Sequence, residues 1–317
     1  MRRFLLGRLA SSLVTLLLVA TFVFVIVNVL PGNPGRQLLG PLAPESEVVK
    51  LNDKLGVNRP LVEQYGASMK DLVTFDFGTS FRSGKSVVAT VRPALFRSVK
   101  LASLALIITI PLGIWAGVFA ARRQDKFADR AVVMAGLTTS SIPDFVTAVV
   151  LSSLFCVTWK FGHVFATPPD GSSISKQFSY LIFPALAMVV LYFGYIARMT
   201  RAGVINALQS DYVRTATMKG LSDRRVMVNH VLRNALAPTI TVISTQIGYL
   251  LGAIIGVERV FNYQGIGLTI TDAVKAKDIP MLQGTVVLVA LVYVAAALLA
   301  DLLIAYLNPR VRLGGGG

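Results

Sequence analysis

Six long apolar segments run along the chain, and polar stretches that carry most of the charged residues separate them. A membrane-spanning helix needs about 20 mostly apolar residues, whereas strands of a membrane barrel show about ten residues of alternating polarity. The segments have the length of helices, so the pattern predicts an all-α polytopic membrane protein with six transmembrane helices. They cover residues 9–30, 101–121, 131–159, 181–197, 235–257 and 281–307, the last interrupted by Asp301.

The first segment could be mistaken for a cleaved signal peptide. It is longer than the apolar region of such a peptide, and no small-residue cleavage site follows it, only Pro31 and Gly32. We therefore expect it to remain as the first transmembrane helix.

The composition agrees with a membrane protein. The chain is 54% hydrophobic and 15% charged, with a mean hydropathy of +0.65, whereas a soluble domain is about 45–50% apolar and about 25% charged. The same figures exclude a disordered chain. One cysteine, Cys156, and two histidines, His163 and His230, exclude an intrachain disulfide and leave little for a metal site. No cofactor or metal is expected on this chain.

The basic residues predict the orientation in the membrane. The net charge is +15. Sixteen Lys and Arg residues lie in the N-terminus, in 122–130, in 198–233 and in the tail, against five in the short loops 160–176 and 259–277. Because short cytoplasmic loops carry an excess of Lys and Arg, this asymmetry predicts both termini inside, N-in/C-in. It also accounts for the basic charge without a nucleic-acid partner.

Five parts follow from this topology. They are the N-terminus with the first helix (1–30), an extracytoplasmic segment (31–100), a membrane core (101–307), a cytoplasmic loop within that core (198–234) and a cytoplasmic tail (308–317). In the extracytoplasmic segment, residues 51–56 and 60–65 read as short helices broken by Gly56 and Pro60.

The 198–234 loop is too long for a simple helix connection. Residues 211–219 are compatible with a helix that breaks at Gly220, and Ser222 can cap a second helix over 223–232. A helix–glycine–helix loop between two spans suggests a docking surface. An Arg-rich helix lying on anionic lipid is an equal alternative at this point.

Catalysis finds little support in the sequence. Two acids lie within apolar segments: Asp144, which follows Pro143, and Asp301. An ionisable group in such a segment faces a cavity, contacts another helix or lies near an interface. Gly84-Lys85-Ser86 imitates a phosphate loop, but the upstream glycine, Gly78, is one residue too distant. His230, among arginines, is expected to form structural hydrogen bonds. The chain is not expected to be an enzyme.

The 198–234 loop closely resembles the EAA loop of ATP-binding-cassette (ABC) importer permeases. Residues 211–222 read DYVRTATMKGLS, and 230–238 continue the match. The form is similar to that of the oligopeptide/dipeptide permease group, in which Arg214-Thr215-Ala216 replaces the generic Glu-Ala-Ala. Other stretches resemble that group too: LPGNP at 30–34 with Asn33 in place of Asp, 55–65, DFGTS at 76–80, SIPDF at 141–145, ERVFNYQGIG at 258–267 with Gln264 in place of Pro, and DIPMLQG at 278–284.

The resemblance implies a type I importer permease of the bacterial cytoplasmic membrane. It implies a homologous second permease subunit, two cytoplasmic ATPase subunits that carry ATP and Mg²⁺, and an extracytoplasmic solute-binding protein. The solute would be a di- or oligopeptide or a related small solute, with nickel chelates, glutathione, opines and sugars left open. The resemblance places ATPase docking on Asp211, Tyr212, Arg214, Thr215, Ala216, Lys219, Gly220, Leu221, Arg224, Arg225 and His230. The translocation pathway or external mouth would include Ser141, Asp144, Glu258 and Asp278.

The alternative hypothesis is an ion-coupled secondary transporter. Transporters of that class usually contain internal repeats and coupling ionisable groups. No repeat is visible in this sequence, and the predicted docking loop would have no purpose in such a protein.

Overall fold

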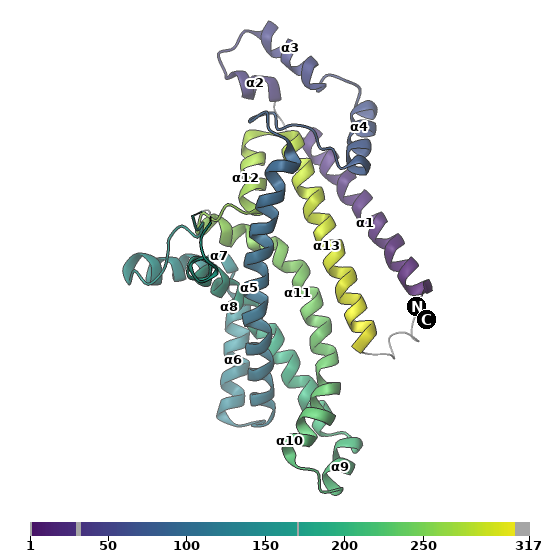
Figure 1. Cartoon of the computed structure of the whole chain (residues 1–317), viewed down its shortest axis with the longest axis vertical. Coiled ribbons are helices and arrows are strands. Elements are labelled where there is room, and N and C mark those ends of the chain that lie inside the picture. The colour runs from purple at the N-terminus through teal and green to yellow at the C-terminus, as the bar shows by residue number, and fades with distance from the viewer. Residues whose placement is uncertain (1, 30–32, 170, 308–317) are drawn as a thin grey trace. The chain divides into compact units, whose positions relative to one another are not determined.

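A computed structural model of the chain describes residues 2–29, 33–169 and 171–307. The predicted tail, 308–317, and residues 30–32 of the LPGNP stretch lie outside the described residues. Within the described part the regular structure is helical, apart from one isolated antiparallel bridge between Thr79 and Ser86 (Figure 1). Two compact units divide the chain: unit 1 comprises Met1–Ser98 and Gln264–Val294, and unit 2 comprises Val99–Tyr263 and Ala295–Gly317.

Four helices of the described part are long and apolar enough to cross a membrane, and up to six spans result if each of two bent helix pairs is one span. The four are α1 (Arg2–Val29), α5 (Val87–Ala121), α8 (Ile174–Leu208) and α13 (Ile279–Leu307). The helical, polytopic fold class is therefore confirmed. The number of six spans and their orientation stay predictions.

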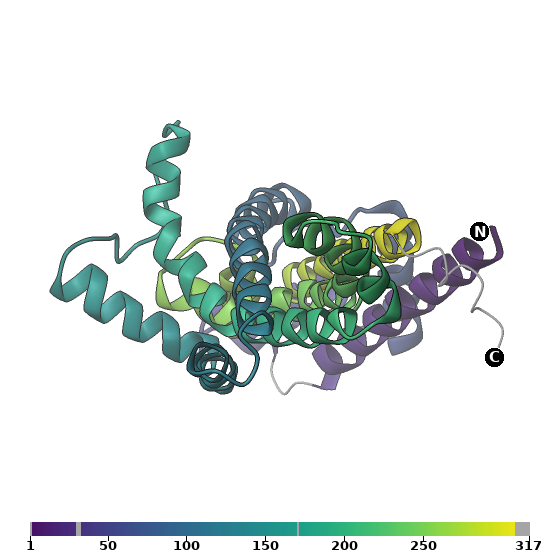
Figure 2. The same cartoon turned by 90° about the horizontal axis from the view of Figure 1, so that it is seen from below.

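The third apolar segment is not one straight helix, which corrects the expectation for 131–159. It forms α6 (Phe127–Ser141), α7 (Asp144–Leu151) and the π-helical η1 (Ser152–Thr158), with a bend of 99° after α6 (Figure 2). The cause is Pro143. It has no N–H to donate and disfavours helical geometry at the residue before it, and Ile142 is extended, with φ −91° and ψ 124°.

Two helices extend beyond the apolar segments that predicted them. Residues 87–100, assigned from the sequence to the extracytoplasmic segment, form the first turns of α5, and residues 198–208 of the predicted loop are the last turns of α8. Hydropathy shows where a helix is apolar and not where it begins, because charged residues such as Arg92 and Arg201 are good helix formers.

Unit 1 contains the two predicted short helices, both longer than expected, as α3 (Glu45–Leu55) and α4 (Leu61–Thr74). A further short helix, α2 (Pro34–Leu39), was not predicted. Gly56 ends α3 with a left-handed φ of 72°, and Pro60 precedes the first turn of α4. Asn33, where the family pattern has Asp, still caps α2 by accepting a hydrogen bond from the N–H of Arg36 at 3.0 Å.

The C-terminal part of unit 1 contains α12 (Ile266–Ala276) and the first part of α13. Gln264, where the family pattern has Pro, precedes α12. Its backbone carbonyl accepts a hydrogen bond from the guanidinium of Arg97 at 3.2 Å. The substituted residue therefore contributes to this contact through its backbone.

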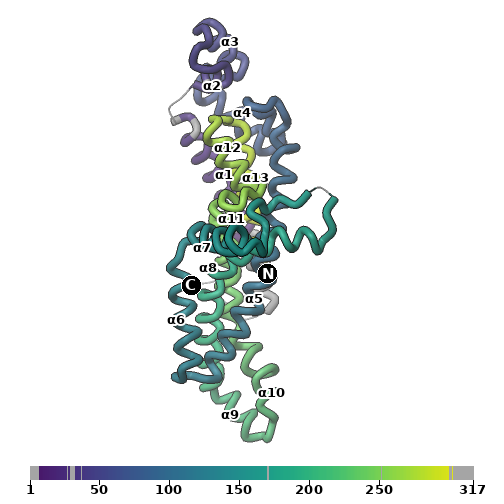
Figure 3. Tube along the Cα trace, turned by 90° about the vertical axis from the view of Figure 1, so that its left-hand side faces the viewer, coloured from purple at the N-terminus to yellow at the C-terminus, as the bar shows by residue number. Residues whose placement is uncertain are grey.

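In unit 2, α8 packs against α6, α7 and α11 (Arg233–Val260) (Figure 3). Glycines allow the close approach. A Cβ placed on Gly194 of α8 would collide with the carbonyl oxygen of Gly136 of α6, and one on Gly203 would collide with the carbonyl of Ala235 of α11. The helices of this unit are therefore in backbone contact at defined positions.

Candidate functional site

The predicted helix–glycine–helix loop lies at one end of unit 2, beyond the turn between α5 and α6 (Figures 1 and 3). Its first helix is α9 (Asp211–Met218), and Asp211 in the first turn complements the helix dipole. Gly220 then takes a left-handed conformation, with φ +75°. Glycine adopts this conformation without steric cost, so the predicted break at Gly220 is confirmed.

The second helix of the loop differs from the prediction. The chain forms α10 (Asp223–Arg225), continues as the π-helical η2 (Val226–Leu232) and passes directly into α11. Ser222 occupies the N-cap position, but its side chain makes no capping hydrogen bond. The predicted helical start at Asp223 is confirmed, but the predicted end at Leu232 is wrong, because the helix continues as α11 to Val260.

One face of the loop is fixed to the chain by apolar packing. Val213 and Ala216 of α9 are buried, and Leu221 and Leu232 pack against the same group of side chains. The other buried members of this cluster are Ala121, Val204, Ala207, Val226, Val231 and Ala235. Ala216 is only 5% exposed. Its small side chain therefore serves internal packing, which corrects the expectation that Ala216 belongs to the docking surface.

The opposite face of the loop is exposed and mixed in character. Tyr212 and Met218 present 42% and 72% of their surface. Tyr212 was a predicted docking residue and Met218 was not. Five more of the predicted docking residues are also exposed: Asp211, Arg214, Thr215, Lys219 and Gly220. Arg224 and Arg225 follow on α10, likewise exposed, whereas His230 is half-buried on η2. An apolar centre surrounded by basic groups suits a partner groove with acidic side chains.

A partly buried ion pair that the sequence did not predict joins the helix leading into this loop to its neighbour. The guanidinium of Arg201 on α8 donates two hydrogen bonds to the carboxylate of Asp129 on α6, one of them at 2.6 Å from Nη2 to Oδ2. Asp129 is 2% exposed and also accepts from the N–H of Asp125 at 2.9 Å. The bidentate geometry fixes the orientation of α8 relative to α6.

The four predicted pathway residues differ in their surroundings and hydrogen-bond partners. Ser141, at the end of α6, is exposed and donates to the carbonyl of Leu137 at 2.9 Å. Asp144 begins α7. Within the described part of the chain its buried Oδ2 has no hydrogen-bond partner, and neither has the hydroxyl of Tyr192. A Cβ on Gly256 of α11 would come within 3.7 Å of that same oxygen. These groups are compatible with a polar contact between helices, and their role in a pathway stays a prediction.

Glu258 and Asp278 are both buried, at 0% and 3% exposed. Glu258 lies in unit 2 at the end of α11, where its carbonyl accepts from the N–H of Tyr263 at 2.9 Å. Asp278, in unit 1, caps α13 and binds the loop at residues 80–82. The carboxylate of Asp278 thus has structural partners that account for its burial.

The segment that imitates a phosphate loop is a short connection stabilised by other contacts. The backbone N–H groups of Phe81 and Arg82 donate to Asp278 at 3.0 and 3.2 Å, so they are not available to a phosphate. In the described ranges, no group of three or more His, Cys, Asp or Glu side chains is placed to hold a metal ion.

Comparison with known proteins gives a consistent result along the chain. Residues 110–313 match the family model for binding-protein-dependent transport system inner membrane components, and residues 1–102 match the model for the N-terminal part of such components. A probable peptide ABC transporter permease protein of Sinorhizobium fredii is 33% identical, over 98% of this chain and 99% of the relative.

Two further relatives carry other names. The dipeptide transport system permease protein of Alkalihalophilus pseudofirmus is 35% identical, over 91% of this chain and 93% of its own length. The glutathione transport system permease protein of Salmonella choleraesuis is 32% identical, over 98% and 99%. The similarity therefore extends over nearly the whole of each protein.

Proposed function

This chain belongs to the family of binding-protein-dependent transport system inner membrane components, and we propose that it forms the pore of a peptide importer together with a second, homologous permease subunit. It is a multi-pass inner membrane protein and a permease subunit of a binding-protein-dependent importer. Such a component is not itself catalytic, and its family implies ATPase and binding-protein partners.

The loop at α9 and α10 is the observation that carries the proposal. Its apolar side is packed into unit 2, and its outer side exposes Tyr212, Met218 and basic groups around Gly220. A rigid segment of this kind can transmit a push from a partner to α8 and α11, which continue on either side of it. We propose that each of two cytoplasmic ATPase subunits contacts one permease subunit, and that ATP hydrolysis occurs on those partners.

The direction of transport requires this loop to be cytoplasmic. The excess of basic residues in and around it supports that placement, with both termini inside and six spans. Closure of the ATPase subunits would then shift the permease between inward-facing and outward-facing states. A solute-binding protein would deliver solute from the opposite side.

The names of the relatives support a peptide as the solute. Two of the three relatives described above are named for peptide or dipeptide transport, and glutathione, the solute in the third name, is itself a short peptide. We propose a short peptide with free termini as the transported class.

Uptake by the assembled transporter tests this proposal. The chain, its second permease, the ATPases and the binding protein would be reconstituted in vesicles with labelled dipeptide outside and ATP inside. Uptake should require ATP and persist when an ionophore collapses the ion gradients. Uptake without ATP, or its loss with the ionophore, would instead indicate ion coupling.

A further inference from the structure

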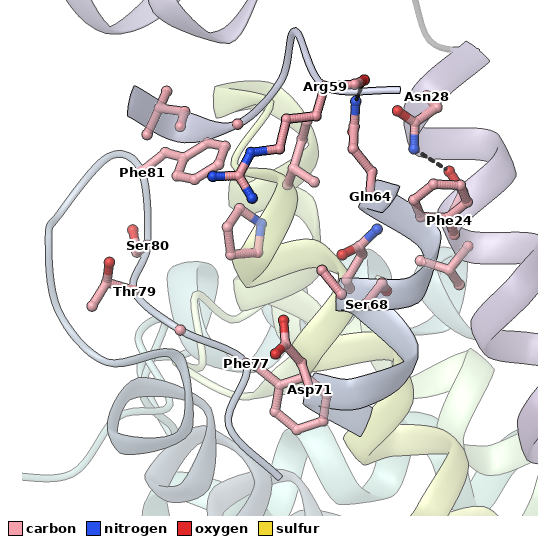
Figure 4. Close-up of a pocket in the computed structure, with 18 of the residues that line it drawn as sticks. Phe24, Asn28, Arg59, Gln64, Ser68, Asp71, Phe77, Thr79, Ser80 and Phe81 are labelled. Carbon is pink, nitrogen blue, oxygen red and sulfur yellow. Dashed lines mark hydrogen bonds between the residues drawn. The ribbon is translucent and has the colours of Figure 1, made fainter. Parts of the chain in front are cut away.

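Unit 1 contains a cavity of about 570 Å³ to which nothing above assigns a ligand. Its walls come from α1, α3, α4, the connection around residues 77–84 and the beginning of α13, all within that unit (Figure 4). Its volume falls within the roughly 300–1,000 Å³ of small-molecule sites. Aromatic side chains, Phe24, Phe77 and Phe81, supply apolar surface, and Ser68 and Gln283 supply polar groups.

Two side chains of opposite charge face this cavity from different parts of unit 1. The guanidinium of Arg59, on the α3–α4 connection, and the carboxylate of Asp71, on α4, are both directed into the same space (Figure 4). Within the described part of the chain, neither group takes part in a hydrogen bond or an ion pair. Asp71 is half-buried, so its charge lacks full hydration, and no hydrogen bond or ion pair within the described residues compensates for this.

The walls that carry these groups are held in place. The side-chain amide of Gln64 donates to the carbonyls of Val57 and Arg59 at 2.9 and 2.8 Å, which fixes the connection that carries Arg59. On the neighbouring wall, Asp278 fixes the loop at Phe81. On α1, the hydroxyl of Thr21 lies 2.9 Å from that of Tyr65 on α4. A cavity with walls fixed in this way loses little entropy when a ligand binds.

We propose that this cavity binds a short peptide with free termini, its carboxylate at Arg59 and its ammonium at Asp71. The separation of the two groups suits that length. Residue 71 lies about 15 Å along α4 from its first turn, at 1.5 Å per residue, and both side chains extend into the gap. A di- or tripeptide covers about 7–11 Å when extended. The aromatic side chains contact its side chains, and Ser68 and Gln283 hydrogen-bond its peptide groups.

Lys54 and Glu63 also border the cavity, both on exposed surface. Water screens these exposed charges, and that of the likewise exposed Arg59, more than the charge of Asp71. Arg59 differs from the other two because its guanidinium is directed into the cavity (Figure 4). The site adds to the proposed function a place where a short peptide binds. It rests on that function in one respect: that the bound peptide is a transported solute.

Equilibrium dialysis of the purified chain with radiolabelled alanyl-phenylalanine tests the site. The chain would be held in nanodiscs of phosphatidylglycerol, which contain no zwitterionic headgroup. Arg59→Gln and Asp71→Asn should each weaken binding at least tenfold. Lys50→Gln and Glu47→Gln, exposed on α3 and outside the cavity, are the matched charge controls and should leave binding unchanged.

Blocked peptides assign each charge to its partner. The N-acetylated dipeptide should bind more weakly than the free one and be insensitive to Asp71→Asn, and the dipeptide amide should be insensitive to Arg59→Gln. No saturable binding to the wild type, or equal losses in the control variants, would overturn the site. The site would also be overturned if peptide binding were lost in phosphatidylethanolamine nanodiscs while Arg59→Gln and Asp71→Asn had no effect on it. That result would indicate that peptide and lipid headgroup compete for a position outside the cavity.

The result separates this site from the proposed function. Binding to the isolated chain needs neither the ATPases nor the binding protein. Dipeptide binding combined with absent ATP-driven uptake in the assembled complex would refute the importer proposal and leave the site intact. Intact uptake without binding would refute the site alone.

Discussion

The hydroxyl of Ser80 donates a hydrogen bond to the carboxylate of Asp278, a residue 198 positions further along the chain. The same carboxylate accepts from the N–H groups of Phe81 at 3.0 Å, Arg82 at 3.2 Å and Met281 at 3.3 Å. The single carboxylate of Asp278 therefore both caps α13 and fixes the connection between α4 and α5.

Asp278→Asn should loosen that connection. An amide offers one acceptor oxygen in place of two and turns its NH₂ group toward backbone donors, so we expect a cost of about 1–3 kcal/mol. Trypsin cleavage after Arg82 and Lys85 should accelerate. Ser83→Ala is the control, because the Ser83 hydroxyl accepts only a long bond from Lys85 at 3.4 Å. Cleavage at the wild-type rate in Asp278→Asn would show that the carboxylate does not hold the loop.

Gly194→Ala should destabilise unit 2. The added Cβ meets the carbonyl oxygen of Gly136 and the hydroxyl of Ser140, so α6 and α8 must separate, at a cost of about 1–3 kcal/mol. The midpoint of thermal aggregation in detergent should fall. Gly252→Ala is the matched control in another apolar helix, since a Cβ there meets nothing within 4 Å. Equal midpoints for the two variants would contradict the close packing.

Gly220→Gln should impair coupling while the chain still inserts normally. A Cβ at Gly220 meets nothing within 4 Å in this chain, so the local cost is left-handed strain of about 1–2 kcal/mol. Gly171 has the same φ of +75° and the same open space, so Gly171→Gln carries equal strain outside the loop.

The comparison of these two glycine variants isolates partner contact from strain. In the assembled transporter, Gly220→Gln should lose uptake and solute-stimulated ATP hydrolysis, whereas Gly171→Gln should retain both. Equal activity of the two variants would favour the alternative in which the loop only lies on lipid.

Cysteine labelling tests the predicted orientation. Cys156, the single cysteine, is buried and would be replaced by alanine to give an unlabelled background. In intact cells, a membrane-impermeant maleimide should label a cysteine at Ser172, a half-buried position, and not one at Lys126, an exposed position. The reverse pattern would refute the N-in/C-in topology.

Asp71 should make stability depend on pH. Burial, together with the nearby charge of Asp76, raises the pKa of Asp71 above its ordinary value, although Lys70 partly opposes this. The folded state thus disfavours the carboxylate form. This destabilisation is fully present above the raised pKa and is relieved as pH falls through it toward the ordinary value of about 3.9.

Asp71→Asn should accordingly unfold at a higher temperature than the wild type at neutral pH, and the difference should shrink as the pH approaches 4. Scanning fluorimetry at several pH values measures this. Glu47→Gln, an exposed charge removal on α3, should show no such convergence. A wild type that is more stable than Asp71→Asn at neutral pH would mean that Asp71 has a stabilising partner.

Much of the fold and part of the candidate site followed from local sequence. Apolar length alone predicted every long apolar helical region, because lipid requires about 20 apolar residues per span. Gly56, Pro60 and Gly220 were recognised as helix breaks, because the conformational limits of glycine and proline act on their immediate neighbours. The exposed face of α9 was expected as well, from its resemblance to a known loop.

The tertiary structure alone decided which distant groups meet. Nothing in the sequence indicated three pairings: Asp129 with Arg201, Ser80 with Asp278, and Arg59 with Asp71 across one cavity. Ala216 reads as part of a docking motif, yet its burial depends on residues from α5 to α11. Hydropathy and turn chemistry act between near neighbours in the chain, whereas contacts across it depend on the rotation and register of whole helices, which packing determines.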